Sequence, residues 1–234
     1  MRLIRKGVKG MATTVTTTGR PAVGESNALT WLNGWIRSHK QLAAYLVVAL
    51  VVALALFAWS FLTAKTAERS AGRQIAQGRL ALDSKNYPLA ASVLSQVVEN
   101  FSGTHAAQEA SILLAQARLA QGQTQQAIEV LQRSAPKADK YFRAQTYGLL
   151  GGAYENALRP TDAATAYEAA AAAALYPFLR AQFLSDAGRA WLAAGDSAKA
   201  LAAYRTIAEK LDSTTAAGEA KVRLGELTKG SGHP

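Results

Sequence analysis

The chain has 234 residues, with 26 Lys and Arg against 16 Asp and Glu, and a formal net charge of +10. Half of its residues are hydrophobic and alanine is abundant, a composition that favours packed helices over a β-sheet. The absence of cysteine excludes disulfides, thiolate catalysis, Cys-ligated metal centres and a lipid-modified N-terminal cysteine. Residues 1–40 hold seven Lys and Arg and one Glu, so most of the positive charge lies in a short tail.

The first forty residues contain two segments of different character. Residues 1–30 have little apolar surface to bury, and we expect them to form a disordered cytoplasmic tail. In residues 31–41, four apolar side chains share one helical face and cations follow them, which is typical of a juxtamembrane amphipathic segment. These apolar residues are Trp31, Leu32, Trp35 and Ile36. A simple N-terminal extension of the next helix is the alternative.

Residues 42–62 read LAAYLVVALVVALALFAWSFL, without a charge, Pro or Gly. A helix of this length, rising about 1.5 Å per residue, spans the roughly 30 Å hydrocarbon core of a bilayer. We predict one transmembrane helix here, with Trp31, Trp35, Tyr45 and Trp59 as anchors at the membrane interfaces. A buried core helix would show a polar stripe, and a signal peptide would have a shorter apolar run.

The sequence gives weaker evidence for which end of this helix faces the cytoplasm. Seven Lys and Arg precede it and four occur in the twenty residues after it, which favours a cytoplasmic N-terminus. However, only Arg37 and Lys40 lie within the twenty residues before it, and a start at Met11 would leave three cations against four. Charge counting alone therefore leaves the orientation open.

A repeat occupies the rest of the chain. Ala90, Ala127, Ala163 and Ala200 recur at intervals of 37, 36 and 37 residues, each four residues before a large side chain. Twelve residues upstream of each lies another small residue. The large residues are Leu94, Leu131, Tyr167 and Tyr204, and the upstream small residues are Gly78, Ala115, Gly151 and Gly188.

This pattern predicts helical hairpins in which the small residues of the two helices face each other and large residues fill the space between adjacent hairpins. Connectors such as AQGQT, NALRPT and AAGDS supply the Gly, Pro, Asn and Asp that end one helix and cap the next. A single hairpin cannot bury its apolar faces, so we expect the hairpins to stack into a right-handed α-solenoid.

The repeat resembles the tetratricopeptide repeat family. Residues 144–177 match best, 181–214 follow, and 71–104 and 108–141 match more weakly, with Arg118 where an aromatic residue is usual. The best match rests on Tyr147, Leu150, Gly151, Tyr154, Ala163, Tyr167 and Ala170. The resemblance implies an all-α protein with one N-terminal transmembrane helix and a repeat domain over residues 63–229. That domain would have about four hairpins and a capping helix over Ala216–Thr228, followed by a disordered C-terminus at 230–234.

No constellation of residues indicates catalysis. The three histidines, His39, His105 and His233, lie far apart, and the run Gly148–Gly152 lies inside a hairpin, where close helix packing explains it. We therefore expect no enzyme activity, catalytic residue, cofactor, metal or small-molecule substrate. Positive and negative charges alternate beyond the tail, so we expect no nucleic-acid partner either.

The first helices of successive hairpins would line a groove suited to an extended peptide or a partner helix, with the convex face as the alternative binding surface. Its lining would mix amides, charged side chains and leucines. The candidate residues are Arg79, Leu82, Gln116, Leu119, Gln145, Gly152, Glu155, Asn156, Gln182, Arg189 and Leu192.

The whole layout, with the WLNGWIRSHK approach to one span and repeats to the C-terminus, resembles the bacterial YfgM-like family. That resemblance implies a single-pass inner-membrane protein with a periplasmic repeat domain. It also implies a role as an ancillary subunit of the Sec translocon that assists secreted proteins beside a prolyl isomerase or another envelope chaperone. Two alternatives stay open: a structural accessory subunit of another membrane complex, and a cell-envelope assembly or division factor.

Overall fold

The computed structural model describes residues 35 and 37–228, and all regular structure among them is helical. The chain divides into two compact units, residues 1–58 and 59–234. The predicted disordered segments at 1–30 and 230–234, and the predicted anchor Trp31, lie outside the described residues.

In the first unit, a short helical turn precedes the long helix α2 (Lys40–Asp83). The Trp35 ring stacks on the His39 imidazole with the ring centroids 5.4 Å apart, and Ser38 Oγ donates to the Trp35 carbonyl at 2.9 Å. His39 itself is not helical, so a break separates this turn from α2. Tyr45 follows on α2 with its ring exposed.

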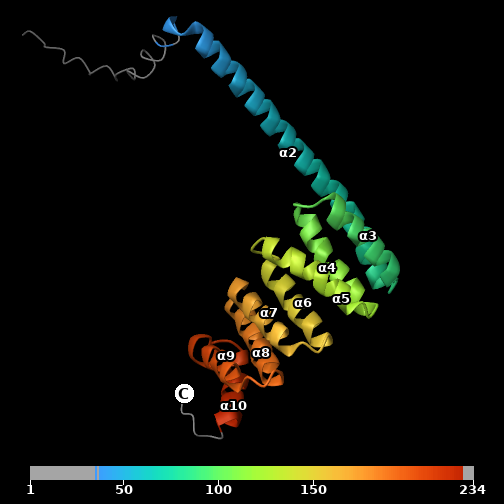
Figure 1. Ribbon diagram of the computed structural model, residues 1–234, viewed down its shortest axis with the longest axis vertical. Helices are drawn as coiled ribbons and strands as arrows, with labels where there is room; N and C mark the ends of the chain where they lie inside the picture. Colours follow the sequence, from blue (N-terminus) through green and yellow to red (C-terminus); the bar gives the residue numbers. More distant parts are fainter. Residues whose placement is uncertain (1–34, 36, 229–234) are drawn as a thin grey trace, which may run out of the picture. The chain divides into compact units, whose positions relative to one another are not determined.

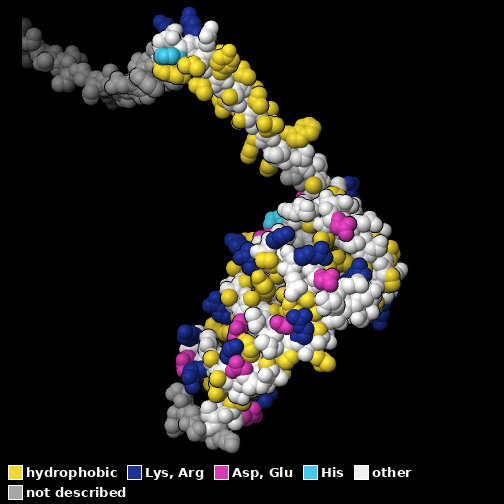
Figure 2. Space-filling view, viewed as in Figure 1, with side chains coloured by type: hydrophobic (Ala, Val, Ile, Leu, Met, Phe, Trp, Pro, Cys, Tyr) yellow, Lys and Arg dark blue, Asp and Glu magenta, His cyan; other side chains and the backbone are white. Residues whose placement is uncertain are grey.

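Helix α2 contains the whole predicted span and continues without interruption into the second unit. Among the described residues, it is the one helix long and apolar enough to cross a membrane, and none of its most apolar window is buried within the chain. Its hydrophobic side chains appear along the helix in Figure 2. The exposure of this window contradicts the alternative of a core helix packed inside the chain.

The second unit is a stack of helical hairpins in chain order, as Figure 1 shows. The C-terminal part of α2 pairs with α3 and each later pair forms one hairpin, so the prediction of an all-helical solenoid is confirmed for the described residues. The remaining elements are α3 (Tyr87–Asn100), α4 (His105–Ala120), α5 (Thr124–Ser134), the 3-10 turn η1 (Ala135–Lys137), α6 (Arg143–Asn156), α7 (Pro160–Ala173), α8 (Pro177–Ala193), α9 (Ser197–Lys210) and α10 (Ala216–Thr228).

Within a hairpin, the small residue of the first helix receives the large residue of the second. A Cβ atom built on Gly151 would lie 2.6 Å from the Tyr167 ring, and one on Gly188 would lie 2.7 Å from the Tyr204 ring. Gly78 has the same relation to Leu94. The large side chain thus packs against the glycine inside its own hairpin, whereas the sequence pattern predicted that the large residues fill the space between adjacent hairpins.

Between hairpins, buried aromatic residues of the first helices reach back to the preceding second helix. The Tyr154 hydroxyl accepts a hydrogen bond from Gln132 Nε2 of α5 at 2.6 Å, and Trp191 Nε1 donates to Glu168 of α7 at 2.7 Å. Phe183 of α8 contacts α6 at Gly148, where a Cβ atom would collide with its ring. The interpretation of the Gly148–Gly152 run as a close-packing surface is confirmed.

The turns inside the four hairpins share one backbone conformation. The second residue after each first helix has a positive φ: 59° at Lys85, 73° at Gly122, 56° at Leu158 and 81° at Gly195. Glycine adopts this left-handed conformation without strain, whereas Lys85 and Leu158 do so at an energetic cost. In two of the four turns the next residue caps the second helix: Asn86 Oδ1 accepts from the Leu89 amide at 3.3 Å, and Asp196 Oδ1 accepts from the Lys199 amide at 3.0 Å.

The apolar core divides into two clusters at the second hairpin. One cluster joins α2, α3 and most of the buried face of α4, and the other extends from Ala115 and α5 to α10. Arg118 occupies the repeat position that Tyr154 and Trp191 hold in the next two hairpins. It is half-buried and donates to Gln123 rather than packing into the core, which accounts for the division at this point.

Candidate protein-binding groove

Every predicted groove residue lies on one of the first helices, α2, α4, α6 or α8, and is exposed or half-buried. Parallel first helices of neighbouring hairpins bring equivalent positions close together, because each position recurs once per repeat. Among the described residues, a cavity lined mainly by α2 and α4 contains only Arg79 of the predicted set. Two further cavities along this row of helices, called the first and the second cavity below, gather larger and different subsets.

The first cavity has a volume of about 640 Å³ and brings together four predicted residues from three successive hairpins. These are Arg79 and Leu82 of α2, Gln116 of α4 and Gln145 of α6. Phe142 and Glu109, which the sequence analysis did not select, complete its wall with Ile112 and Leu113. This cavity therefore combines an apolar floor with amide and charged groups at its rim.

The second cavity, of about 690 Å³, lies at the C-terminal end of the stack. It includes the predicted Gln182, Arg189 and Leu192 of α8. Helix α10 forms its other wall with Glu219 and Arg223, which the sequence analysis treated only as parts of a capping helix. No sequence pattern points to them, because their place in this wall follows from the packing of α10 against α8 and α9.

Leu119, Glu155 and Asn156 line neither cavity. Glu155 instead links two hairpins: the Tyr167 hydroxyl donates to its Oε2 at 2.8 Å, and Arg189 Nη1 donates to its Oε1 at 2.6 Å. Burial and the hydrogen bond to the Glu155 carboxylate raise the pKa of the Tyr167 phenol far above its ordinary range. Asp186, bonded to Arg189 at 3.0 Å, and Glu155 likewise raise the pKa of the guanidinium.

The two predicted groove arginines therefore have partners inside the chain. Arg79 pairs with Glu109 of the next hairpin, as Arg189 pairs with Glu155 of the preceding one. In contrast, the side chains of Gln116, Gln145 and Gln182 are exposed and form no hydrogen bond with any other described residue. These amides can donate to and accept from the backbone of an extended peptide.

The described residues hold no group of three or more His, Asp and Glu side chains placed to bind a metal ion. The nearest approach to a reactive pair is His105 Nδ1 and Asp139 Oδ2, which are 2.6 Å apart. Asp139 also accepts hydrogen bonds from the amides of Tyr141 and Phe142, so its carboxylate holds the turn that precedes α6. The arrangement is suited to joining connectors, not to transferring a proton to a substrate.

The family model described as "Tetratricopeptide repeat" matches residues 75–141. Two crystal structures of nearly identical TPR-like repeats assigned to a kinesin light chain of Podosopora anserina, one of them a point variant, are 19% identical to this chain. Each match covers 70% of this chain and 87% of the other, with a TM-score of 0.55. BtubC (BKLC) from P. vanneervenii is 20% identical over 70% of this chain and 66% of its own, with a TM-score of 0.46. No curated protein matches the sequence.

These similarities establish the class of the fold. The described helical stack is a TPR-like solenoid, and the family match covers its first two hairpins, which were the weaker ones in the sequence analysis. Repeat solenoids of this kind offer extended surfaces to which other proteins can bind, so the fold makes protein binding the function to test.

Proposed function

We propose that the chain is a single-pass protein of the bacterial inner membrane, with its N-terminus in the cytoplasm and its repeats in the periplasm. There it acts as a docking scaffold, an ancillary subunit of the Sec translocon that assists secreted proteins together with a prolyl isomerase or another envelope chaperone. One observation carries the proposal: an exposed apolar run long enough to span a bilayer continues directly into a TPR-like solenoid with an open groove.

The composition of the groove supports binding of a polypeptide. An unfolded or extended segment offers backbone amides and scattered apolar side chains, and the first cavity offers unpaired amides above Ile112 and Leu113. Contacts of this kind recognise the backbone and the shape of a bound peptide more than its sequence. Such recognition suits a protein that binds many different secreted chains. The intramolecular pairing of Arg79 and Arg189 reduces the charge available for a strongly acidic ligand.

A second candidate function is favoured by the apolar helix itself. None of its most apolar window is buried within the chain, so this surface is available for contact with another transmembrane helix. The protein would then be a structural accessory subunit of a membrane complex. Replacing residues 42–62 by an unrelated span separates the two candidates: loss of association favours the accessory subunit, and retention favours the scaffold.

Site-specific photocrosslinking in cells tests the scaffold proposal. We expect benzoylphenylalanine at Gln116 or Gln145 to form adducts with a translocon component, an envelope chaperone or a secreted protein. Gln126, exposed on the second helix of the same hairpin as Gln116, is the matched control and should form few adducts. Equal adducts at all three positions, or no envelope protein among the adducts, would contradict a role for the groove.

A further inference from the structure

Exposed aromatic side chains of the solenoid are confined to two connectors. Tyr141 precedes α6 and is 67% exposed, whereas Tyr176 and Phe178, at the start of α8, are each 58% exposed. All other described aromatic side chains between residues 63 and 228 are buried or half-buried. The Tyr176 and Phe178 rings stack with centroids 5.7 Å apart, and the Lys140 ammonium lies 5.0 Å from the centroid of the Tyr141 ring.

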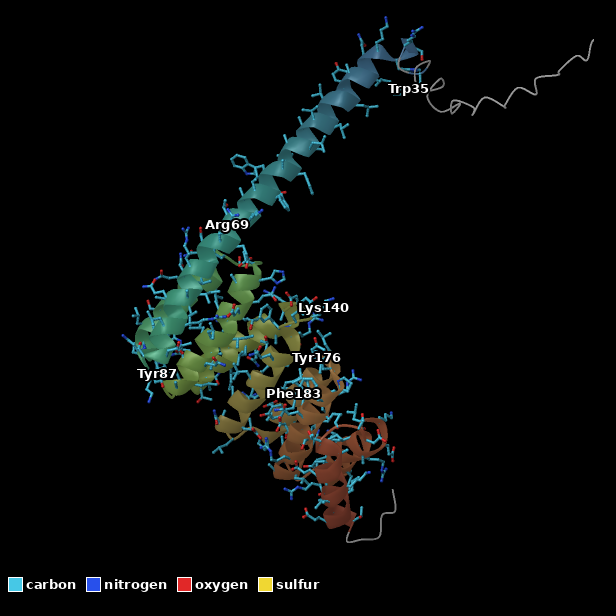
Figure 3. All side chains as sticks on the ribbon, turned by 180° about the vertical axis from the view of Figure 1, so that it is seen from behind. Trp35, Arg69, Tyr87, Lys140, Tyr176 and Phe183 are labelled. Atoms are coloured by element: carbon cyan, nitrogen blue, oxygen red, sulfur yellow. The ribbon has the colours of Figure 1, made fainter. Side chains whose placement is uncertain are left out.

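These connectors lie at one edge of the solenoid, which we call the connector edge and define as residues 135–143 and 174–180. Phe183 contacts α6 at Gly148, so α6 and α8 run in register and begin at the same level. Figure 3 shows Lys140 and Tyr176 on one side of the solenoid and Tyr87, at the start of α3, on the other. The aromatic residues of the two connectors therefore form part of one surface.

The connector edge also carries positive charge that no carboxylate neutralises. Its two segments contain four cations, Lys137, Lys140, Arg143 and Arg180, and one acidic residue, Asp139, whose carboxylate is occupied by backbone amides and His105. None of the four cations forms an ion pair with a carboxylate among the described residues, although Arg143 and Arg180 each donate Nε to a backbone carbonyl, that of Ala138 at 2.9 Å and that of Ala171 at 3.1 Å. Figure 2 shows Lys and Arg side chains along this margin of the solenoid.

The opposite edge, formed by the turns inside the hairpins, is different. There Arg159 Nε lies 2.7 Å from Asp162 Oδ2, and Lys199 Nζ lies 3.5 Å from Asp196 Oδ2. The exposed large hydrophobic side chains at that edge, Leu89 and Leu158, are aliphatic. Lys85 lies there as well and forms no ion pair with a described residue, but no exposed aromatic ring accompanies it. The combination of unpaired cations with exposed aromatic rings thus distinguishes the connector edge from the opposite one.

Hydrogen bonds and an ion pair place the Asp139 segment of the connector edge close to Glu68, which follows the apolar run on α2. The Glu68 carboxylate of α2 accepts from the amides of His105 and Ala106 at 3.2 and 2.9 Å, and His105 contacts Asp139 of the connector edge. The apolar run ends at Leu62, six residues before Glu68, or about 9 Å along a helix. The polar headgroup layer of a bilayer leaflet is roughly 5–8 Å thick, so the two distances are similar.

We propose that the connector edge rests on the membrane, with Tyr141, Tyr176 and Phe178 at the level of anionic lipid headgroups and the four cations facing lipid phosphates. Tyrosine is enriched at membrane interfaces, and basic residues near an anionic surface add attraction. The proposal rests on the proposed function, because it requires that residues 42–62 span the bilayer. Its consequence is that the solenoid is held against the membrane surface by one edge, leaving the opposite edge in water.

The absence of cysteine allows a direct test with single nitroxide labels on the full chain. The variants are Tyr141→Cys, Phe178→Cys, Leu158→Cys at the opposite edge, and Val52→Cys in the apolar run, each in nanodiscs of phosphatidylethanolamine and phosphatidylglycerol. Collision rates with oxygen, which partitions into lipid, and with a water-soluble nickel chelate report the depth of each label. We expect the oxygen-to-nickel ratio at residues 141 and 178 to be several-fold higher than at residue 158.

The label at residue 52 separates failure of this inference from failure of the proposed function. A water-like ratio there would overturn the transmembrane helix itself. A lipid-like ratio at residue 52 with water-like ratios at residues 141 and 178 would overturn the membrane contact alone. Low collision rates with both reagents at residues 141 and 178 would also overturn it, because they would indicate contact with protein, such as a second copy of the chain.

A charge variant tests the contribution of the cations. We expect Lys137→Gln combined with Lys140→Gln to lower the oxygen-to-nickel ratio of the residue 178 label toward its value at residue 158. Replacing phosphatidylglycerol by phosphatidylcholine should have the same effect on the unsubstituted edge, since each lysine near an anionic surface contributes roughly fivefold to partitioning. A ratio unchanged by both treatments would contradict recognition of anionic headgroups.

Discussion

Two adjacent glycines of α6 show how strongly the packing depends on single methyl groups. At Gly151 a Cβ atom would collide with the Tyr167 ring, whereas at Gly152 the nearest atom, Tyr167 Oη, would be 3.6 Å away. The two positions share the same helix and differ only in the direction of the Cα–H bond that a methyl group would replace. They therefore form a matched pair for measuring the cost of crowding between the helices of a hairpin.

We predict that Gly151→Ala lowers the free energy of unfolding by about 1–3 kcal/mol, because the Tyr167 ring must move and its hydrogen bond to Glu155 must distort. Gly152→Ala should be neutral or should stabilise by up to about 1 kcal/mol, since alanine has the higher helix propensity. Urea unfolding of the detergent-solubilised chain, followed by circular dichroism, measures both. Equal effects of the two substitutions would contradict the packing described.

We predict that Leu158→Gly stabilises the chain by about 0.5–1 kcal/mol, because glycine adopts the left-handed conformation at this position without strain. The Leu158 side chain is 88% exposed, so its removal costs little burial. Gly195→Ala is the matched control at the equivalent turn and should destabilise by about 1 kcal/mol, because a Cβ atom there meets no neighbour but would strain the backbone. A loss of stability in Leu158→Gly would count against this interpretation.

At the residue scale, the sequence identified the small and large residues that contact one another. It did not identify which large side chain packs against which small residue. The period located Gly151 and Tyr167, yet spacing along the chain does not give the direction in which the Tyr167 ring points. Similarly, the repeat alignment placed Glu155 and Arg189 in a groove, and only the structure shows that they bond to each other. A side chain's partner on another hairpin depends on a rotation between hairpins that a period does not encode.

At the scale of elements, a carboxylate from one helix caps the N-terminus of another. Glu68 of α2 accepts hydrogen bonds from the first two amides of α4, and Thr104 Oγ1 accepts from the amide of Ala107 at 3.0 Å. The positive end of the helix dipole strengthens such contacts with a negative group. The N-terminus of α4 is thereby joined to the part of α2 that follows the apolar run.

We predict that Glu68→Ala destabilises the N-terminus of α4 by about 1–2 kcal/mol, through loss of two charge-assisted hydrogen bonds. Glu68→Gln, which keeps an acceptor oxygen and removes the charge, should cost less. Hydrogen exchange of the His105 and Ala106 amides measures the effect locally, with the amides of α9 as an internal control. Unchanged exchange at both amides in Glu68→Ala would show that the contact contributes nothing to stability.

Asp139 gives the connector edge an acid-sensitive contact. Its partial burial would raise the pKa of the carboxyl, but the Tyr141 and Phe142 amides and the nearby His105 outweigh that effect and hold the pKa below its ordinary value of 3.8. A lowered pKa in the folded state means that the ionised carboxylate stabilises the fold above about pH 3.8. This stabilisation is lost as the pH falls through the folded-state value.

We therefore predict that the free energy of unfolding of the parent chain falls more steeply below pH 3.8 than that of Asp139→Asn, while the variant is less stable near neutral pH. The difference should vanish at strongly acidic pH, where both side chains are uncharged. Thermal unfolding across this pH range measures the two slopes. Parallel curves would indicate that Asp139 titrates as it does in the unfolded chain.

The helices themselves could largely be predicted from sequence, because repeat spacing, connector residues and alanine content agree. What the sequence did not indicate was the continuity of α2 through residues 63–83, although no proline interrupts that stretch. The division of the core at the second hairpin was signalled by Arg118 in an aromatic position. The role of α10 as a wall of the second cavity was not, because it depends on tertiary placement.

At the scale of the whole molecule, the structural similarity and the partial family match define a TPR-like solenoid, and its role as a protein-binding scaffold is our proposal, as are its compartment and its partner. A groove that is lined by amide and aliphatic side chains can bind many polypeptides. Its residues alone therefore do not identify one particular partner. The functional proposal therefore depends first on the compartment in which the solenoid lies, and it requires that the apolar run of α2 spans a membrane.

A C-terminal fusion to alkaline phosphatase, which is active only outside the cytoplasm, tests the central claim of a periplasmic scaffold on a transmembrane anchor. The matched fusion to a fluorescent protein that matures only in the cytoplasm is the control. The account predicts high phosphatase activity in the membrane fraction and no fluorescence from the matched fusion. A fluorescent fusion together with an expressed but inactive phosphatase would contradict it.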